Sequence, residues 1–491
     1  MATALSLSTL SDMPDGVAVP GYARSDLSAG ILHFGIGNFH RAHQATYLDR
    51  LFATGEGQDW AILGAGVMEG DRKARAVLQA QDWLTTLVEQ EATHSRARVI
   101  GSMVGYLEPG DAAAITAALA DPAIRIVSLT ITEGGYFLDS SDRFDPTHPA
   151  IQADASTPDA PGTVFGLILA GLRLRREKGF APFTVMSCDN IPHNGRITRN
   201  ALIGLAELSD PALAAWIAEN ISFPNGMVDR ITPATSDRER GMLESDFGVR
   251  DGWPVFCEAF TQWVLEDDFP SGRPPLEKVG VQFVPDVSPY ELMKIRILNG
   301  GHAVIAYPAG LLDIHFVHEA MEHPLIRAFL AKIEHDEIIP GVPPVPDTDL
   351  GAYYDLIASR FSNPKIGDTV RRLCLDGSNR QPKFIVPSIA DSLARNGSVT
   401  GLALESALWC RYCYGTSESG AEIAPNDPNW DRLTRIAKAA RDDPGTWLGM
   451  EEVYGATGRD ARFASAFSEA LEALWSDGTE AVLTSYIDGR L

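Results

Sequence analysis

The pattern of apolar and polar residues predicts a strand, a turn, a helix and a second strand near the start of the chain. Residues 30–35 form a short apolar run that leads into a glycine turn. Apolar side chains then recur at near-helical spacing over residues 39–52, and a second apolar run follows at residues 60–67. Strand, glycine turn, helix and strand in this order indicate a βαβ unit with a parallel sheet.

The same alternation continues to about Pro285, and helical spacing dominates after it. The pattern predicts helices over residues 111–119 and 163–178, strands over 125–131 and 183–188, and extended runs over 253–264 and 278–284, the last two separated by a Pro- and Gly-rich turn. Beyond Pro285 it predicts helices over residues 288–306, 318–337, 351–360, 399–414, 430–442 and 459–476. The expected architecture is therefore an α/β domain, residues 1–285, followed by a mostly α-helical domain, residues 286–491.

Composition narrows the class of protein. The 491 residues include 41 Lys and Arg against 65 Asp and Glu, a formal net charge of −24, and 45% are hydrophobic. This is globular composition, and the acidic balance argues against a nucleic-acid partner. The N-terminus does not resemble a signal peptide, and no apolar run reaches the length of about 18 residues that a membrane helix needs. We expect a soluble cytoplasmic protein without a membrane partner.

The cysteines do not indicate a disulfide framework. Five are present, an odd number at irregular spacing: Cys188, Cys257, Cys374, Cys410 and Cys413. The last two form a single C-x-x-C pair inside a predicted helix, so buried core thiols are the favoured interpretation over zinc or redox chemistry.

The glycine turn carries half of a dinucleotide fingerprint. Gly35 allows a tight turn after the first strand, and Gly37 lets backbone N–H groups approach a pyrophosphate. The third position of the fingerprint is His40, so the helix should sit further from the sheet than usual. A βα turn that binds no ligand is the alternative. His33, His40 and His43 have no acidic residue nearby in sequence to complete a metal site, so we expect none.

An acidic residue after the second strand would hold the ribose of NAD. Glu69 occupies that place, with Asp71 as the second choice. Arg72 and Lys73 follow and offer the alternative of a bound 2′-phosphate, as in NADP. We favour NAD.

Residues 288–302 predict a helix with one chemically useful face. At about 100° per residue, with Lys294 as zero, Glu291 lies at about 60°, His302 at about 80° and Asn299 at about 140°, whereas Arg296 points away. A lysine whose pKa is lowered can act as a general base. The alternative is an exposed helix with an ordinary Glu–Lys pair. Gly300 and Gly301 favour function, because glycines inside a helix suggest the close approach of a ligand or backbone.

Three more places carry candidate chemistry. Asn190 follows a strand end and suits either hydrogen bonding to an alkoxide or an Asx turn. Asp229 precedes Arg230, where a buried ion pair is the default interpretation. Arg371, Arg372, Arg380 and Lys383 form a local basic patch that suits an anion or polyol hydroxyls, or is plain charged surface.

Five motifs together resemble the polyol-specific long-chain dehydrogenases. They are residues 35–44, residues 187–190, residues 227–233, Lys294 with Arg296, Leu298, Asn299 and His302, and residues 376–380. The similarity covers almost the whole chain, and the motifs follow the family's order. It implies a Rossmann-type NAD-binding domain, a helical substrate domain and a metal-independent active site in a cleft between them. It also suggests a monomer.

The resemblance assigns a role to each candidate residue. Lys294 matches the general base, Asn190 and Asn299 match the donors to the oxyanion, His302 helps to position substrate, and Glu291 links the lysine to bulk water. Asp229, Arg372 and Arg380 match positions that bind the polyol, although some relatives carry Lys at the last of these. The cofactor-binding set is Gly35, Ile36, Gly37, Asn38, Phe39, His40, Arg41 and Glu69.

The implied reaction is reversible oxidation of D-mannitol to D-fructose with NAD. Within the family, a fructuronate or tagaturonate reductase and an arabinitol dehydrogenase remain alternatives. Outside it, the alternatives are a metal-dependent sugar isomerase or hydrolase and a nucleotide-binding sensor without turnover.

Overall fold

The computed structural model describes residues 2–139 and 143–491. The chain divides into two compact units, Met1–Ser288 and Pro289–Leu491. The division falls three residues beyond the boundary expected from the sequence, inside the first turn of the helix that begins at Ser288.

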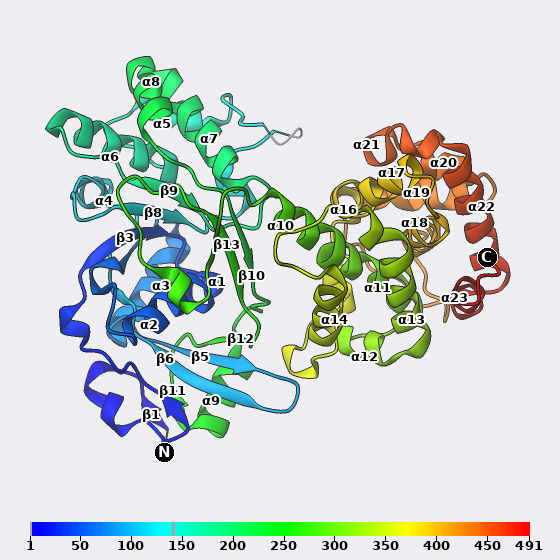
Figure 1. The fold of residues 1–491 in the computed structure, drawn as a ribbon, viewed down its shortest axis with the longest axis horizontal. Helices are drawn as coiled ribbons and strands as arrows, with labels where there is room; N and C mark the ends of the chain where they lie inside the picture. The colour runs from blue at the N-terminus through cyan, green and yellow to red at the C-terminus, as the bar shows by residue number, and fades with distance from the viewer. Residues whose placement is uncertain (1, 140–142) are drawn as a thin grey trace. The chain divides into compact units, whose positions relative to one another are not determined.

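The first unit is built on a parallel sheet with the strand order β7-β4-β3-β8-β9. Figure 1 labels three of these strands, β3, β8 and β9. Its strands are β3 (Ala29–Phe34), β4 (Ala61–Ala65), β7 (Met103–Tyr106), β8 (Ile126–Leu129) and β9 (Thr184–Ser187). β3, the first of these five strands along the chain, lies in the middle of the sheet, and the strand order reverses between β3 and β8. The carboxyl ends of these two strands therefore form the topological switch point, where open α/β sheets bind ligands. The predicted Rossmann-type domain is confirmed.

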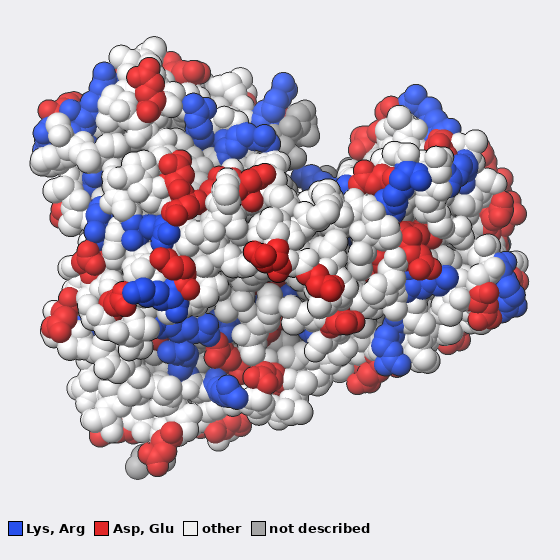
Figure 2. Space-filling model, viewed as in Figure 1, with Lys and Arg blue, Asp and Glu red and all other residues white. Residues whose placement is uncertain are grey.

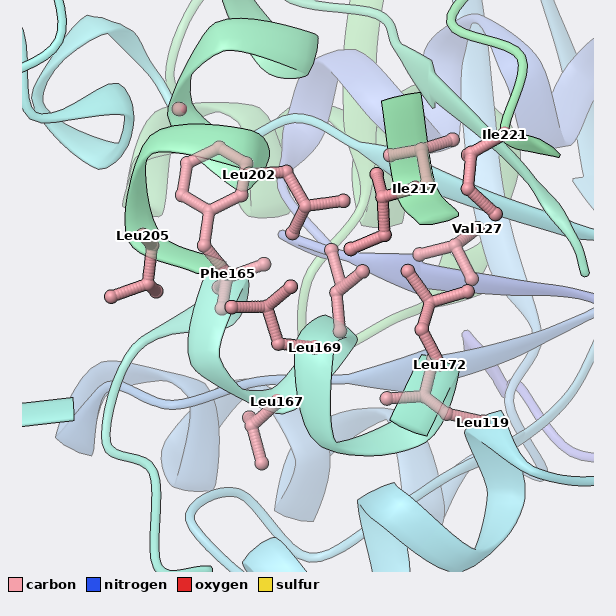
Figure 3. Packing of buried hydrophobic residues seen from close by; sticks show 14 of the residues in the cluster. Leu119, Val127, Phe165, Leu167, Leu169, Leu172, Leu202, Leu205, Ile217 and Ile221 are labelled. Carbon is pink, nitrogen blue, oxygen red and sulfur yellow. The ribbon is translucent and has the colours of Figure 1, made fainter. Parts of the chain in front are cut away.

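Alternating side chains of β3 enter two separate cores. Leu32 and Phe34 pack in one cluster with residues of α4 (Ala112–Leu119), α6 (Val164–Lys178), α7 (Asn194–Ser209) and α8 (Pro211–Asn220). Figure 3 shows side chains of this cluster from α4, α6, α7 and α8, with Leu172 and Ile217 near Val127 of β8. Ile31 enters the second cluster with residues of α2 (Gln44–Phe52) and of the strands β10 (Gly226–Asp229) and β13 (Gln262–Glu266). Both faces of the sheet are thus buried, as a parallel sheet requires.

Smaller sheets extend this unit, and the sequence pattern missed part of them. They have the orders β12-β5-β6-β2, β10-β13-β14 and β1-β11. Their strands are β1 (Thr3–Ala4), β2 (Val17–Ala18), β5 (Thr85–Gln90), β6 (Ser95–Ile100), β10 (Gly226–Asp229), β11 (Val249–Arg250), β12 (Val255–Glu258), β13 (Gln262–Glu266) and β14 (Gln282–Val284). The predicted run over residues 253–264 is wrong as a single element, because β12 ends at Glu258 and β13 starts at Gln262. Lys278, predicted as extended, lies in a 3₁₀ turn, Leu276–Val279.

The predicted helix over residues 39–52 is two helices. His43 has backbone angles of −113° and −93°, outside the helical region, and separates α1 (Asn38–Ala42) from α2. The remaining helices of this unit are α3 (Glu69–Ala80), α5 (Pro149–Ser156) and α9 (Asp237–Phe247).

The second unit is helical, as predicted. Its helices are α10 (Ser288–Met293), α11 (Gly300–Leu311), α12 (Val317–Glu322), α13 (Pro324–Ile333), α14 (Leu350–Phe361), α15 (Val370–Leu373), α16 (Gly377–Phe384), α17 (Val386–Ala394), α18 (Thr400–Cys413), α19 (Trp430–Ala440), α20 (Gly445–Leu448), α21 (Glu451–Tyr454), α22 (Ala461–Ser476) and α23 (Thr479–Ile487). The helix predicted over residues 318–337 is broken at His323, because the residue before Pro324 is forced toward extended angles. Every residue of α18 after Thr400 is buried, which confirms Cys410 and Cys413 as core thiols.

Two further features of the structure are the distribution of charge on its surface and the length of its helices. Figure 2 shows acidic and basic side chains interspersed over the visible face, although the chain carries a net charge of −24. Within residues 2–139 and 143–491, no helix has the length and apolar character needed to cross a membrane.

Candidate active site

The glycine turn lies at the switch point and is shaped by contact between β3 and β8. Gly35 has a φ of +93°, and a Cβ atom there would lie 2.0 Å from the carbonyl oxygen of Thr130. The Thr130 hydroxyl donates to the Gly35 carbonyl at 2.6 Å. Only glycine fits this position. A Cβ on Gly37 would instead meet nothing closer than the Gly35 oxygen at 3.9 Å, so the turn leaves room for a phosphate to approach the backbone.

His40, at the third fingerprint position, makes the contact between helix and sheet. Its ring stacks on His33 of β3, with centroids 3.5 Å apart, and both side chains are fully buried. His33 bonds Ser128 Oγ at 2.7 Å and Thr130 Oγ1 at 2.9 Å. Burial lowers the pKa of His33 to about 3 and that of His40 well below its usual range, so both rings are neutral. Across the described residues, no three His, Cys, Asp or Glu side chains come together to hold a metal.

The other side chains of the predicted cofactor-binding set mostly contact other residues of the protein. Ile36 is buried in the core. Asn38 donates to the carbonyl of Pro233 and to Thr235 Oγ1, and Arg41 lies 3.8 Å from the ring of Trp253 and donates to Asn38 Oδ1. Phe39 stacks on His43 at 4.9 Å. Contact with a dinucleotide is thus left largely to the backbone of this turn.

The structure separates the two acidic candidates after β4. Oδ2 of Asp71 accepts hydrogen bonds from the backbone N–H groups of Val67 and Met68, which ties this carboxylate to the start of α3. Glu69 begins α3, and its side chain is 84% exposed. Of the two, Glu69 is the carboxylate available to a ribose.

Asp189 joins the loops that follow β8 and β9, and sequence analysis missed it. Its carboxylate accepts hydrogen bonds from the backbone N–H groups of Ile131 and Thr132, both at 2.9 Å, and from Tyr136 Oη at 2.7 Å. Burial raises its pKa, and these three donors offset part of the effect. The loop that carries Asn190 is thereby fastened to the strand beside the glycine turn.

Asn194, also missed, fastens the same loop to β10. Its Nδ2 donates to the carbonyls of Asp189 and Gly226 at 3.1 and 2.8 Å, and its Oδ1 accepts from Gly226 N at 2.9 Å. Asn190 is exposed in this loop, and Asp229 is buried at the end of β10. Arg230 pairs with Glu89 at 2.6 Å. An asparagine in the first turn of a helix is too common for the sequence alone to single out.

The lysine helix is buried, which excludes the alternative of a solvated Glu–Lys pair. Lys294 is 6% exposed and Glu291 is 7% exposed. The helix starts at Ser288, whose backbone N–H donates a hydrogen bond to Asp286 Oδ1 at 2.9 Å. The helix then runs unbroken to Leu311, five residues beyond the predicted end.

Lys294–Asn299 forms a π-helical segment, and this corrects the predicted face. A π-helix has about 4.4 residues per turn, or about 80° per residue, rather than 100°. Asn299 then lies about 40° from Lys294, on the same side as Glu291. His302 lies about 20° from Lys294 on the opposite side. With Glu291 at about 60°, the four residues share a stripe about 80° wide, narrower than predicted. Arg296 still points away and binds Ser388 and Asp391 of α17.

Packing explains one of the two glycines in this helix. A Cβ on Gly301 would lie 3.2 Å from Oε1 of Glu334, and one on Gly300 would lie 3.6 Å from the carbonyl oxygen of Phe384. The Glu334 side chain, rather than a ligand, therefore approaches Gly301 closely, whereas Gly300 has room for a Cβ atom. His302 stacks on Phe361 with centroids 4.2 Å apart.

Glu334 is a neutral carboxylic acid beside this helix, and its place in a charged stretch of sequence gave no sign of burial. It has no exposed surface, and neither carboxyl oxygen has a hydrogen-bond partner within the part of the chain that the structure describes. Burial raises its pKa well above the usual range.

The basic patch is held largely by protein acceptors. Arg372 pairs with Asp368, Arg371 donates to the carbonyls of Ala424 and Pro425, and Arg380 donates to the carbonyls of Arg372 and Leu373. The next residue, Gln381, donates to the buried Glu405 at 2.6 Å, and burial raises the pKa of Glu405 to about 8. The end of α15 and the start of α16, with Arg372 and Arg380, therefore form one connected surface.

Comparison with known proteins accounts for both units. Residues 29–278 match the mannitol dehydrogenase Rossmann domain, and residues 286–475 match the mannitol dehydrogenase C-terminal domain. The chain belongs to the mannitol dehydrogenase family. The predictions of a polyol dehydrogenase and of a helical second domain are thereby confirmed.

Full-length relatives support membership of the mannitol dehydrogenase family. Mannitol 2-dehydrogenase of Cereibacter sphaeroides is 60% identical over 97% of this chain and its own full length. A structure of Pseudomonas fluorescens mannitol 2-dehydrogenase, in ternary complex with NAD and D-mannitol, is 44% identical over 99% of this chain and all of that one, with a TM-score of 0.87. A substrate-free D-sorbitol dehydrogenase is 37% identical, covers 98% of this chain and all of that one, and has a TM-score of 0.92.

The buried histidine stack predicts a pH-dependent loss of stability. Because the pKa of His40 is depressed, the unfolded chain binds a proton below about pH 6.5 that the folded chain does not. His40→Phe keeps an aromatic stack but removes this proton. As the pH falls from 7 to 5, wild type should lose stability relative to His40→Phe, by about 1.4 kcal/mol per pH unit once below pH 6.5. Urea denaturation measures the difference.

Phe52→Leu is the control, because Phe52 is buried in α2 and the change neither adds nor removes a titrating group. Its difference from wild type should stay nearly constant over the same range. A constant difference for His40→Phe would contradict the prediction.

Asn194→Ala should loosen the loop that carries Asn190. The change removes the donor and acceptor that join this loop to Gly226 and leaves buried carbonyls unsatisfied, at a cost of about 2–4 kcal/mol in the free energy of unfolding. The free energy of unfolding, measured by urea denaturation, and kcat should both fall. Asn220→Ala, at the exposed end of α8, should change neither. Wild-type stability and kcat in Asn194→Ala would show that Asn194 does not position the loop.

Proposed function

We propose that this chain catalyses the reversible oxidation of D-mannitol to D-fructose with NAD, using a lysine as general base and no metal. The relatives whose names specify mannitol 2-dehydrogenase support the substrate. The observation that carries the mechanism is the helix stripe on which the buried Glu291 and Lys294 lie together with the half-buried Asn299 and His302.

Oxidation of a secondary alcohol removes a hydride from carbon and a proton from oxygen. A nicotinamide dinucleotide held at the glycine turn would supply the hydride acceptor. Lys294, in its neutral form, takes the hydroxyl proton, and Glu291, one turn earlier, connects the lysine with bulk water. In the reverse direction Lys294 returns the proton to the carbonyl oxygen.

The amides stabilise the charge that develops on oxygen. Asn299 and Asn190 donate hydrogen bonds to the alkoxide-like oxygen, a task that zinc performs in metal-dependent dehydrogenases. His302, held against Phe361, orients the substrate. Asp229, Arg372 and Arg380 bind the remaining hydroxyl groups of the polyol.

The first unit supplies the cofactor site of this proposal. The turn from Gly35 to Arg41 receives the pyrophosphate through its backbone, and Glu69 accepts hydrogen bonds from the adenosine ribose. The open space at Gly37 and the exposure of Glu69 support this assignment.

Two further activities within the family remain to be separated from mannitol oxidation. The likeness to a D-sorbitol dehydrogenase favours sorbitol as a second polyol. Arg372 and Arg380 would also suit the carboxylate of a uronate. Steady-state assays of mannitol, sorbitol, arabinitol, fructuronate and tagaturonate with NAD and NADP, each with and without EDTA, test the assignment. Faster turnover of another substrate, or loss of activity with EDTA, would overturn it.

Lys294→Ala should lower the kcat of mannitol oxidation by about 10³–10⁴-fold, because it removes both the base and a positive charge beside the oxyanion. NADH binding, followed by fluorescence, should persist, since the glycine turn belongs to the other unit. In wild type, oxidation should rise with pH as the amine loses its proton, and the variant should lose this dependence.

A matched control and a rescue complete this test. Lys438→Ala, on the exposed face of α19, should behave as wild type. Added methylamine should restore part of the activity of Lys294→Ala. A near-normal rate of mannitol oxidation by Lys294→Ala would contradict the role of Lys294 as general base.

Asn190→Ala and Asn299→Ala should each lower kcat by about 10²–10³-fold in both directions, the usual effect of removing one oxyanion donor. Asn429→Ala, an exposed amide before α19, serves as control and should leave kcat unchanged. A raised KM with a normal kcat would instead assign these amides to substrate positioning.

A further inference from the structure

Two arginines of α3 are held by a single carboxylate from another part of the sheet. Nη1 of Arg72 lies 2.9 Å from Oε1 of Glu108, and Nη1 of Arg75 lies 3.2 Å from Oε2 of the same residue. Glu108 follows β7, whose partner strand β4 leads into α3. The three side chains therefore meet at the carboxyl edge of the sheet.

This cluster stands beside the carboxylate proposed to bind the ribose. Glu69 begins α3, and its Oε2 lies 3.5 Å from Nε of Arg72. In Rossmann domains an acidic residue here binds the 2′-hydroxyl of NAD, whereas a nearby arginine accommodates the 2′-phosphate of NADP. This chain carries both kinds of residue at one position, so the state of its arginines decides which cofactor is favoured.

The contacts leave little of Arg75 for a phosphate, and they hold two nitrogens of the half-exposed Arg72. Arg75 donates to the Tyr106 carbonyl at 2.8 Å and to Gln79 at 3.0 Å, besides its pair with Glu108. Arg72 is placed between Glu108 and Glu69. Two negative and two positive side chains balance, so an incoming phosphate must compete with carboxylates that already hold the arginines.

We propose that Glu108 is a specificity-determining residue that favours NAD over NADP by holding Arg72 and Arg75. It acts through the arginines and is a positioning residue. The inference rests on the proposed use of a nicotinamide dinucleotide and deepens it. Glu69 repels a 2′-phosphate directly, whereas Glu108 withholds the cations that would attract one.

Binding measurements test this without turnover. Titrations of the full chain with NADH and with NADPH, followed by nucleotide fluorescence, give the ratio of the two Kd values. Glu108→Gln keeps the size and one hydrogen-bonding oxygen but frees the arginines. It should shift the ratio about tenfold toward NADPH, the effect of about one charge-assisted contact with a phosphate. Calorimetry with 2′,5′-ADP and with 5′-ADP should show the same shift.

Two controls separate freed arginines from the mere loss of a negative charge. Adding Arg72→Gln to Glu108→Gln should return most of the gain. Asp59→Asn breaks an equivalent pair, with Arg125 at 2.8 Å, but lies before β4, at the amino end of the strand. It should leave the ratio unchanged.

The outcomes distinguish this inference from the proposed function. An unchanged ratio in Glu108→Gln, an equal shift in Asp59→Asn, or a gain that survives Arg72→Gln would overturn the role of Glu108 while NADH binding stays intact. A wild-type chain that binds neither NADH nor NADPH would overturn the proposed function itself.

Discussion

The carboxyl ends of β3 and β8 approach so closely that Gly35 has no space for a side chain, and the order of the first unit extends from this contact. Thr130 bonds both Gly35 and His33. The next two backbone N–H groups bond Asp189, and Asn194 links that loop to Gly226. One continuous set of hydrogen bonds thus connects the glycine turn, the Asn190 loop and the strand of Asp229.

Buried ionisable side chains occur in both units. They are stabilised either by hydrogen-bond donors or by staying neutral. Asp189 is surrounded by three donors, His33 and His40 stay neutral, and Glu334 holds its proton because no donor is near enough to replace water. Burial of such groups costs free energy unless they are paired or neutralised. Those beside the glycine turn and the lysine helix lie where protonation states would matter to chemistry.

The sequence predicted what depends on local pattern and on motifs. The βαβ unit, the helical second domain, the core cysteines and the family could all be inferred, because apolar periodicity and short motifs carry that information. Asp189, Asn194 and Glu334 could not, since their roles depend on partners that are distant in sequence or on burial within a charged stretch. The β5–β6 hairpin and the break at His43 likewise follow from tertiary packing. The proposed catalytic roles remain predictions.

The π-helical segment also affects how relatives should be aligned. A π turn is equivalent to one residue inserted into an α-helix, so a shortened relative could lose that residue and still form a continuous helix. Its downstream residues would then be rotated by about 100° against the upstream ones, and Asn299 and His302 would leave the side of Lys294. A single gap in this stretch would thus mark a lost active-site arrangement even where every motif residue is present.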